Sequence, residues 1–174
     1  AEAYVPHPEL RAETPIIGYL GRIRRYKSVE HVLDALKLIL PKIPDVRLLL
    51  VGDGERLPEV RKRAVTLGLT DKIEFTGFVG EAEKVKLLSR MWLCINPSPK
   101  EGWCISVIEA NACGKPVIGI KAMAMLDTLV HGKTAFLARV AQEVRGRPVQ
   151  LVAPFREDVA MVRKPHRLLH ILLH

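Results

Sequence analysis

Short apolar runs alternate with longer segments of helical periodicity along most of this chain, and this alternation limits the folds open to it. The apolar runs predict six strands, over 15–20, 46–51, 72–75, 92–96, 117–120 and 135–137. Apolar residues at helical spacing predict helices over 29–40, 57–67, 82–89 and 105–112. Nearly continuous apolar strands separated by helices are typical of a parallel sheet that is buried on both faces.

The sequence therefore predicts an α/β fold, a doubly wound parallel sheet of the Rossmann-like kind. With 174 residues, the chain can bury one full core but is too short for two ordinary domains. Hydrophobic residues make up 48% and charged residues 26%, the balance of a globular protein. Aromatic residues are only 5%, which argues against a surface that stacks nucleic-acid bases, so no nucleic-acid partner is expected. The net charge of +8 suits anionic ligands such as phosphates.

Cysteine spacing gives no sign of a disulfide framework or a metal site. The three cysteines form no C-x-x-C pair and no zinc spacing with the six histidines. No apolar stretch reaches the roughly 20 residues that span a bilayer, and the N-terminus lacks the layout of a signal peptide. The sequence predicts a cytoplasmic protein without a bound metal or other cofactor.

Ligands of doubly wound sheets bind beyond the carboxyl ends of the strands, so the ligand-binding residues are expected in the loops at that edge. These loops begin at Gly21, Gly52 and Gly77 and run over 97–101 and 120–128. A nicotinamide-binding G-x-G-x-x-G loop is rejected, because Leu57 stands where the third glycine would follow Gly52 and Gly54. The first loop, 21–27, is dense in arginine and lysine, which suits either an anion site or a solvated surface.

Two glutamates with seven residues between them, Glu101 and Glu109, form the most specific motif. The run from Glu101 to Val117 resembles the paired-glutamate motif in the donor-binding half of retaining glycosyltransferases of the GT-B fold, the group 1 (family 4) enzymes. Further landmarks of that family follow in the same order: Gly21-Arg22 with Lys27, Val51-Gly52-Asp53-Gly54, Phe75 to Val79, Pro97-Ser98 and His131-Gly132-Lys133-Thr134. The resemblance covers about residues 15–137.

The resemblance implies a role for each matching residue. Glu101 would hold hydroxyls of the transferred sugar, and Glu109 would hold the ribose hydroxyls of the nucleotide. Arg22 and Lys27 would contact the diphosphate, so Glu101, Arg22 and Lys27 are the predicted catalytic residues. The predicted donor site also includes Gly21, Gly52, Phe78, Val79, Gly102, Trp103, Cys104 and Ile105. The ligand would be a UDP- or GDP-sugar, and no residue separates the two bases.

No Asp-x-Asp metal-binding pair occurs in the chain, so fixed cations and backbone N–H groups would stabilise the departing diphosphate. On one continuous helix, Glu101 and Glu109 would be about 12 Å apart along the axis. That is wider than the roughly 5 to 9.5 Å between the two carboxyls of a glycosidase, which disfavours glycoside hydrolysis. A plain structural role stays open for Glu109, as a carboxylate on a helix surface, and for Phe78 and Val79, as packing residues.

The chain departs from the family at four positions where glycine is usual, namely Ser28, Cys104, Ala124 and Ala135. A side chain at each position removes low-cost access to positive φ. The substitution at Cys104 is expected to matter most, because backbone N–H groups approach the donor phosphates there. Weakened or lost donor binding is therefore one expectation.

The predicted organisation is a linker remnant over 1–14, a nucleotide-sugar-binding domain over 15–138 and an atypical tail over 139–174. Apolar and basic residues near the end of the tail fit a packing helix or contact with the inner face of a membrane. The N-terminal acceptor-binding domain of the same enzyme would be absent, so this fragment should bind the donor without catalysing transfer. Two alternatives stay open: half of a nucleotide-sugar 2-epimerase, and a degenerate non-catalytic domain that serves as an interaction module.

Overall fold

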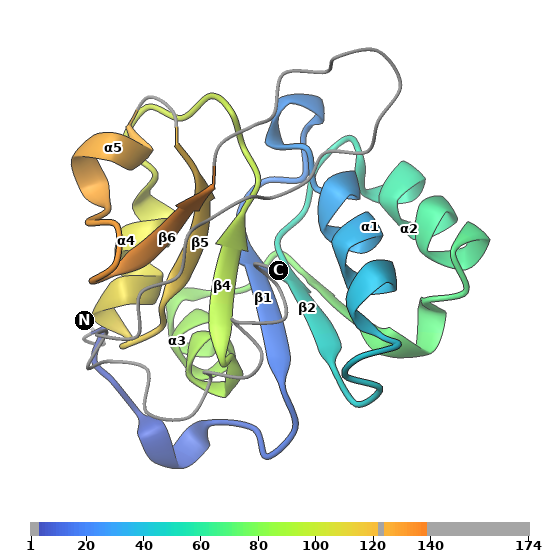
Figure 1. Cartoon of the computed structure of the whole chain (residues 1–174), viewed down its shortest axis with the longest axis horizontal. Helices are drawn as coiled ribbons and strands as arrows, with labels where there is room; N and C mark the ends of the chain where they lie inside the picture. The colour runs from blue at the N-terminus through green and yellow to red at the C-terminus, as the bar shows by residue number, and fades with distance from the viewer. Residues whose placement is uncertain (1–3, 122–123, 139–174) are drawn as a thin grey trace.

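The computed structural model describes residues 4–121 and 124–138, and within them a single six-stranded sheet (Figure 1). Its strands are β1 Ile16–Leu20, β2 Arg47–Val51, β3 Ile73–Gly77, β4 Leu93–Asn96, β5 Val117–Ile120 and β6 Ala135–Ala138. The order across the sheet is β3-β2-β1-β4-β5-β6, and every neighbouring pair is parallel. The predicted parallel sheet is confirmed, with strand ends within two residues of those expected.

Five α-helices lie in the described residues: α1 Glu30–Ile39, α2 Leu57–Thr66, α3 Glu81–Arg90, α4 Ile105–Ala112 and α5 Met125–Thr128. The first four match the helices that periodicity predicts. Short 3₁₀ turns add η1 Pro8–Leu10, η2 Arg25–Lys27 and η3 Thr70–Lys72. Residues 120–128 were expected to be a loop, and α5 was not predicted because four residues are too few to show a helical period.

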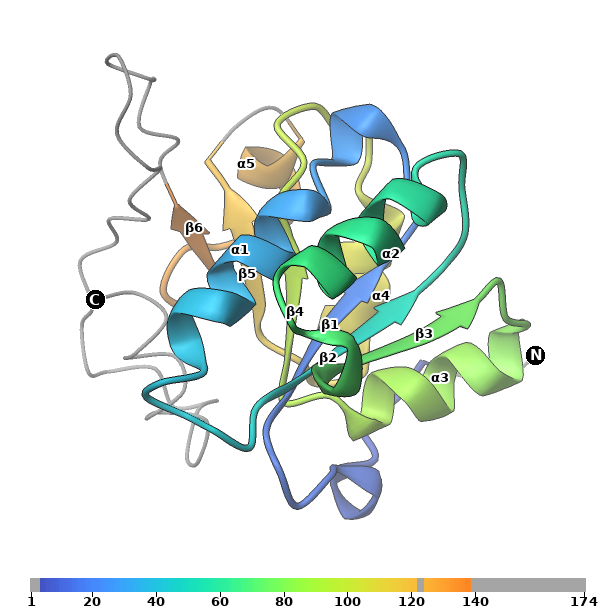
Figure 2. The ribbon, with the colours of Figure 1, turned by 90° about the vertical axis from the view of Figure 1, so that its right-hand side faces the viewer.

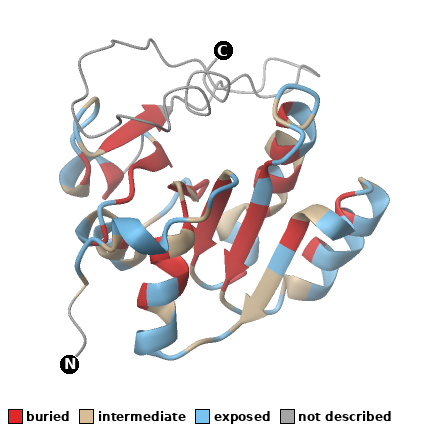
Figure 3. Ribbon diagram, turned by 90° about the horizontal axis from the view of Figure 1, so that it is seen from below, coloured by how far each residue is buried: buried red, intermediate tan, exposed pale blue. Residues whose placement is uncertain are grey.

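Helices cover both faces of the sheet and divide the core in two. Figures 1 and 2 show α1 and α2 on one side and α3 and α4 on the other. Alternate residues of β1 enter the two cores: Ile17 and Tyr19 pack toward α1 and α2, whereas Ile16 and Leu20 pack toward α3 and α4. Figure 3 shows how deeply the central strands are buried. A strand buried on both faces explains why β1 reads as an unbroken apolar run.

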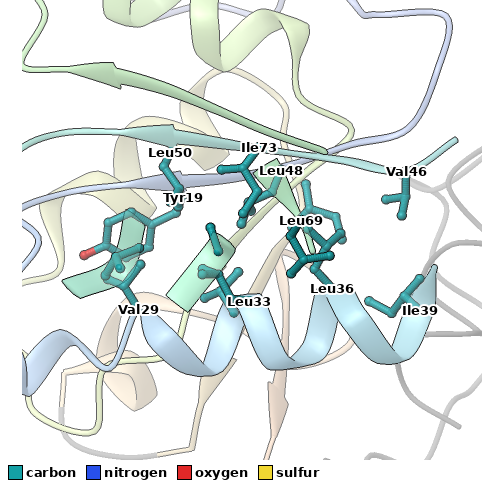
Figure 4. Close-up of a cluster of buried hydrophobic side chains, with 14 of the residues drawn as sticks. Tyr19, Val29, Leu33, Leu36, Ile39, Val46, Leu48, Leu50, Leu69 and Ile73 are labelled. Carbon is teal, nitrogen blue, oxygen red and sulfur yellow. The ribbon is translucent and has the colours of Figure 1, made fainter. Parts of the chain in front are cut away.

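The core that faces α1 and α2 is shown in Figure 4, where side chains of α1 point toward the sheet. Leu33 and Leu36 of α1 are fully buried with Leu48 and Leu50 of β2. Their removal from water supplies a large share of the folding free energy, because burial of one such side chain is worth about 1.5–3 kcal/mol.

The order of the strands places a switch point between β1 and β4. From β1 the chain crosses through α1 to β2 on one side, and from β4 it crosses through α4 to β5 on the other. The two connections therefore diverge at the carboxyl ends of β1 and β4, where doubly wound sheets bind ligands. The loops 21–29 and 97–104 lie at this point.

Two glycines let the loop after β2 pack against the loop after β1. A Cβ on Gly52 would lie 2.0 Å from the Gly21 carbonyl oxygen, and one on Gly54 would lie 2.3 Å from the Ile23 carbonyl oxygen. Both glycines also have positive φ. The two loops are joined by a hydrogen bond from the Ile23 N–H to the Asp53 carbonyl at 2.8 Å. Gly52 thus fixes the position of the cationic loop.

The segment expected to be a linker remnant lies against the domain from Tyr4 onward. The Trp92 indole N–H donates to the Ala12 carbonyl at 2.7 Å, and the Arg11 guanidinium lies 5.1 Å from the Trp92 ring centroid. Tyr4 and Ala12 pack on the core that faces α3 and α4. The predicted tail, with its packing-helix and membrane-contact alternatives, lies outside the described residues. Within 4–121 and 124–138, no helix has the length and apolar character to cross a membrane.

Candidate functional site

Glu101 and Lys27, both predicted to be catalytic, meet at the switch point. The Lys27 ammonium donates to Glu101 Oε1 at 2.5 Å, and the two side chains are 13% and 8% exposed. Asn96, at the end of β4, is buried and donates from Nδ2 to the same glutamate oxygen at 3.4 Å. The structure thus joins a residue of the loop after β1 to a residue of the loop after β4.

A second bond ties the same two loops together. The Ser98 hydroxyl donates to the Tyr26 carbonyl at 3.4 Å and to the Lys100 carbonyl at 3.0 Å. The backbone N–H of Ser98 donates to Asn96 Oδ1 at 3.0 Å. Because Asn96 uses both ends of its amide, it fixes the path of loop 97–104 around Glu101.

The cationic loop is also held from inside the domain. The buried Tyr19 hydroxyl donates to the Arg22 carbonyl at 2.8 Å. Burial, followed by the nearby negative charge of Glu101, raises the pKa of Tyr19, so its hydroxyl stays protonated and keeps donating. The Arg22 side chain itself is exposed at the ligand-binding edge. The Gly21 N–H, at the end of β1, donates to the Val51 carbonyl at 3.0 Å.

At two of the four positions where the family usually has glycine, the backbone is left-handed although the residue is not glycine. Ser28 and Cys104 both have φ of 52°. The Cys104 side chain is buried, and its sulfur accepts a hydrogen bond from Asn96 Nδ2 at 3.0 Å. Burial raises the pKa of the Cys104 thiol to about 12, followed in size by the effect of Glu101. The substituted residue therefore preserves the loop conformation and directs a neutral thiol into the protein.

The remaining two departures need no left-handed backbone in this structure. Ala124 has right-handed helical angles at the start of α5, and Ala135 lies in β6. The expectation that a side chain removes a needed positive φ is therefore wrong at these two positions. Glycine was inferred there from the family pattern alone.

Glu109 lies on α4 in a second polar cluster. Its Oε1 accepts hydrogen bonds from the Lys84 ammonium at 3.0 Å and from the Tyr4 hydroxyl at 3.0 Å. Lys84 also donates to Glu81 at 2.7 Å, and the Tyr4 hydroxyl shares its single proton between Glu81 and Glu109. Both the Glu109 and the Lys84 side chains are 16% exposed. Glu109 is thus a held, partly accessible carboxylate rather than a freely solvated one.

The other predicted site residues lie at the carboxyl edge with different exposures. Phe78, after β3, is 87% exposed, and Trp103 and Ile105 are 77% and 65% exposed. Gly102 is exposed as well, whereas Val79 is partly buried against the core that faces α3 and α4. Val79 therefore has the packing role that the sequence analysis left open for it, and the exposed aromatic side chains are available to a ligand.

The continuous helix used to compare the two glutamates is not present. Helix α4 begins at Ile105, so Glu101 precedes it in a loop and only Glu109 is helical. The 12 Å rise therefore does not describe their separation. Sequence reasoning also missed Asn96, Lys84 and Tyr4. A polar residue that ends an apolar strand could have signalled Asn96, whereas the sequence carries no signal that joins Lys84 or Tyr4 to Glu109.

Within the part of the chain that the structure describes, no three His, Cys, Asp or Glu side chains gather as a metal site. The three cysteines are free thiols. Among the predicted site residues, the charged ones are Arg22, Lys27, Glu101 and Glu109.

Comparison with solved structures supports the fold. The C-terminal domain of a group 1 glycosyl transferase family protein, LpcC from Francisella tularensis, is 24% identical, with a TM-score of 0.69 over 79% of this chain and 77% of that chain. Anabaena HepE, solved in complex with UDP-glucose, is 28% identical, with a TM-score of 0.66 over 73% of this chain and 35% of that chain. The fold is that of the C-terminal half of a GT-B glycosyltransferase.

Sequence comparison gives the same family. The chain is 29% identical over 151 residues to 2-deoxystreptamine glucosyltransferase of Streptomyces kanamyceticus, covering 82% of this chain and 39% of that enzyme. It is 29% identical over 139 residues to N-acetyl-alpha-D-glucosaminyl L-malate synthase of Bacillus anthracis, covering 79% of this chain and 36% of that enzyme. The chain thus spans less than two fifths of the length of these relatives. The family model for group 1 glycosyl transferases matches residues 2–144, and the chain therefore belongs to the group 1 glycosyltransferase family.

Proposed function

We propose that this chain is the donor-binding part of a retaining glycosyltransferase and that it binds a UDP-sugar. The observation that carries the proposal is the arrangement of the two motif carboxylates. Glu101 and Glu109 each accept two protein hydrogen bonds on Oε1, and among the described residues neither accepts one on Oε2. A carboxylate with an unoccupied oxygen can accept bonds from sugar or ribose hydroxyls.

Each end of the donor has a matching group. Glu101, beside Lys27 at the switch point, takes hydroxyls of the transferred sugar, and Glu109 takes those of the ribose. Arg22 and Lys27 neutralise the diphosphate that lies between these two ends. Lys27 has three N–H donors and uses one on Glu101, so others remain for phosphate oxygens. Uridine is favoured over guanosine because HepE, at 28% identity, was solved with UDP-glucose.

The positions of these charged groups explain how the bond between the sugar and the diphosphate could be cleaved. When the glycosidic bond to the diphosphate breaks, negative charge grows on the departing oxygen. Cations fixed before the reaction stabilise that charge without reorganising, and Arg22 and Lys27 supply them. Glu101 orients the sugar so that the acceptor hydroxyl can bond to the anomeric carbon from the same face that the diphosphate leaves, which retains the configuration, and the departing diphosphate oxygen takes the proton of that hydroxyl. The acceptor would be held by an N-terminal acceptor-binding domain of the same enzyme.

Calorimetric titration of the 174-residue chain with UDP, UDP-glucose, GDP and ADP tests the proposal. UDP-glucose should bind more tightly than UDP, because Glu101 adds hydrogen bonds to the sugar. Glu101→Gln should remove most of that advantage, about tenfold for one bond to a charged group, and leave UDP binding in place. Added chelator should change neither affinity. Absence of binding by every nucleotide would contradict the proposal.

A degenerate domain is the second candidate, and it is favoured by the side chains of Ser28 and Cys104, which stand at left-handed positions where the family usually has glycine. Cys104→Gly separates the two. The Cys104 side chain points to Asn96 and is buried, so if the wild-type chain binds UDP, the variant should bind within about threefold of it. A chain that binds no nucleotide either with Cys104 or with glycine there would be degenerate.

A further inference from the structure

We propose that Lys84 and Tyr4 are positioning residues, which hold the Glu109 carboxylate so that one of its oxygens faces the ribose hydroxyls of the donor. The inference rests on the proposed function, because it assigns these two residues to the ribose end of the same site. Neither residue belongs to the paired-glutamate motif. They reach Glu109 from helix α3 and from the segment that precedes β1.

Lys84 and Tyr4 converge on one oxygen of Glu109. The Lys84 ammonium donates to it at 3.0 Å, and the Tyr4 hydroxyl, which shares its single proton between Glu81 and Glu109, lies 3.0 Å from the same oxygen. No other described residue donates to the second oxygen. Two bonds that converge on one oxygen fix both the position and the rotation of a carboxylate, and they leave the lone pairs of the other oxygen to a ligand.

Lys84 and Tyr4 both keep their protons at physiological pH. Burial alone would lower the pKa of Lys84, but its bonds to Glu81, Tyr4 and Glu109 together raise it, so the side chain remains a cation. Burial, with the bond to Glu81, raises the pKa of Tyr4 to about 12, so its hydroxyl remains a donor. Glu109 is therefore held by one permanent charge and one neutral donor over the whole physiological pH range.

The bond from Lys84 to Glu109 positions Glu109 more than it stabilises the fold. Lys84 already has a partner on its own helix, since Glu81 lies one turn away at 2.7 Å. Its bond to Glu109 is therefore not needed to satisfy the ammonium. Exposed ion pairs within a helix add little to stability. The bond from Lys84 to Glu109 instead restricts the side chain of Glu109, which would otherwise sample several rotamers.

The test compares the affinities of the chain for UDP and for 2′-deoxy-UDP. The ratio of the two affinities measures the contribution of the ribose 2′-hydroxyl, and it does not change when a variant weakens the binding of both nucleotides equally. The wild-type chain should favour UDP by about tenfold, the effect of one hydrogen bond to a charged group. Glu109→Gln should bring the ratio near one. Lys84→Met should lower it to about threefold or less, and Lys84→Arg, which keeps a cationic donor, should restore most of it.

Lys86→Met is the matched control. Lys86 lies on the same helix, is 67% exposed and is paired only loosely with Glu83 at 3.9 Å. Its loss removes the same charge and should leave the ratio unchanged. Melting temperatures of all variants show whether a change in ratio comes with a change in fold.

Tyr4→Phe is the second variant, because it removes only the hydroxyl and keeps the ring that packs on the core. It should lower the ratio about twofold. If Lys84→Met fails to fold, an unchanged ratio in Tyr4→Phe overturns the inference. A wild-type ratio near ten that persists in Lys84→Met overturns the inference and leaves the proposed function standing. A wild-type chain that binds neither nucleotide overturns both.

Discussion

Glu101 and Glu109 are held in the same way by different parts of the molecule. Each accepts, on a single oxygen, one bond from a lysine and one from a neutral group, which is Asn96 for Glu101 and Tyr4 for Glu109. The partners of Glu101 come from the end of β4 and the loop after β1, at the centre of the sheet. The partners of Glu109 come from α3 and from the N-terminal segment, at its periphery.

The same arrangement of hydrogen bonds should therefore contribute differently to the stability of the fold at the two glutamates. The Lys27–Glu101 pair is the more buried of the two, with side chains 13% and 8% exposed against 16% for both Lys84 and Glu109. Lys84 has Glu81 as a second carboxylate, whereas Lys27 has only Glu101 among the described residues. Damage near Glu101 should therefore affect folding and binding together, and damage near Glu109 should affect mainly binding.

The largest effect is expected from Gly52→Ala. The new Cβ would lie 2.0 Å from the Gly21 carbonyl oxygen, at a φ of 136°, so the loops after β1 and β2 must separate. The free energy of unfolding should fall by about 4 kcal/mol, measured by urea denaturation. Gly77→Ala is the control, since its φ of 71° is also positive but nothing lies within 4 Å, and it should cost about 1 kcal/mol. Equal losses in both variants would show that backbone strain, and not loop contact, matters at Gly52.

The second prediction compares the two lysines directly. Lys27→Met leaves Glu101 buried without its cation and should destabilise the chain by about 3 kcal/mol. Lys84→Met leaves the Glu109 carboxylate with the Tyr4 hydroxyl, at a more exposed site, and should cost about 1 kcal/mol. Denaturation curves of both variants and the wild type at low salt check this. A Lys84→Met loss as large as that of Lys27→Met would contradict the distinction between the centre and the periphery.

The third prediction uses Lys115, which has no carboxylate partner within residues 4–121 and 124–138, to sharpen the comparison. Its buried ammonium donates to the Ser89 carbonyl at 2.8 Å. Burial, followed by repulsion from Arg11, lowers its pKa from 10.5 to about 8. Between about pH 8 and 10.5 the unfolded chain binds more protons at this site, so the stability contributed by Lys115 should rise with pH.

Lys115→Met should remove that rise. The stability difference, wild type minus variant, should grow by about 2 kcal/mol from pH 7 to pH 10, and other titrating groups cancel in the difference. Thermal denaturation at the two pH values measures it. A difference that stays constant with pH would show that the ammonium keeps its ordinary pKa despite its burial.

Much of the fold followed from local patterns. Unbroken apolar runs such as 46–51 predicted strands because a strand covered on both faces needs apolar side chains on both. The residues Lys27 and Glu101 were named from motif positions that the structure brings into contact. The short helix α5 and the left-handed backbone at Cys104 were not predicted, since a four-residue helix has no visible period and cysteine rarely takes positive φ.

The sequence by itself determined the order of strands and helices, the parallel sheet and the motif residues at its carboxyl edge, because these depend on periodicity and on spacing along the chain. Only the tertiary structure decided which side chains orient the two glutamates. Tyr4 is 105 residues from Glu109, and Lys84 is 25 residues from it, in a different helix. Such contacts depend on how α3, α4 and the N-terminal segment pack across one face of the sheet, and no local pattern encodes that packing.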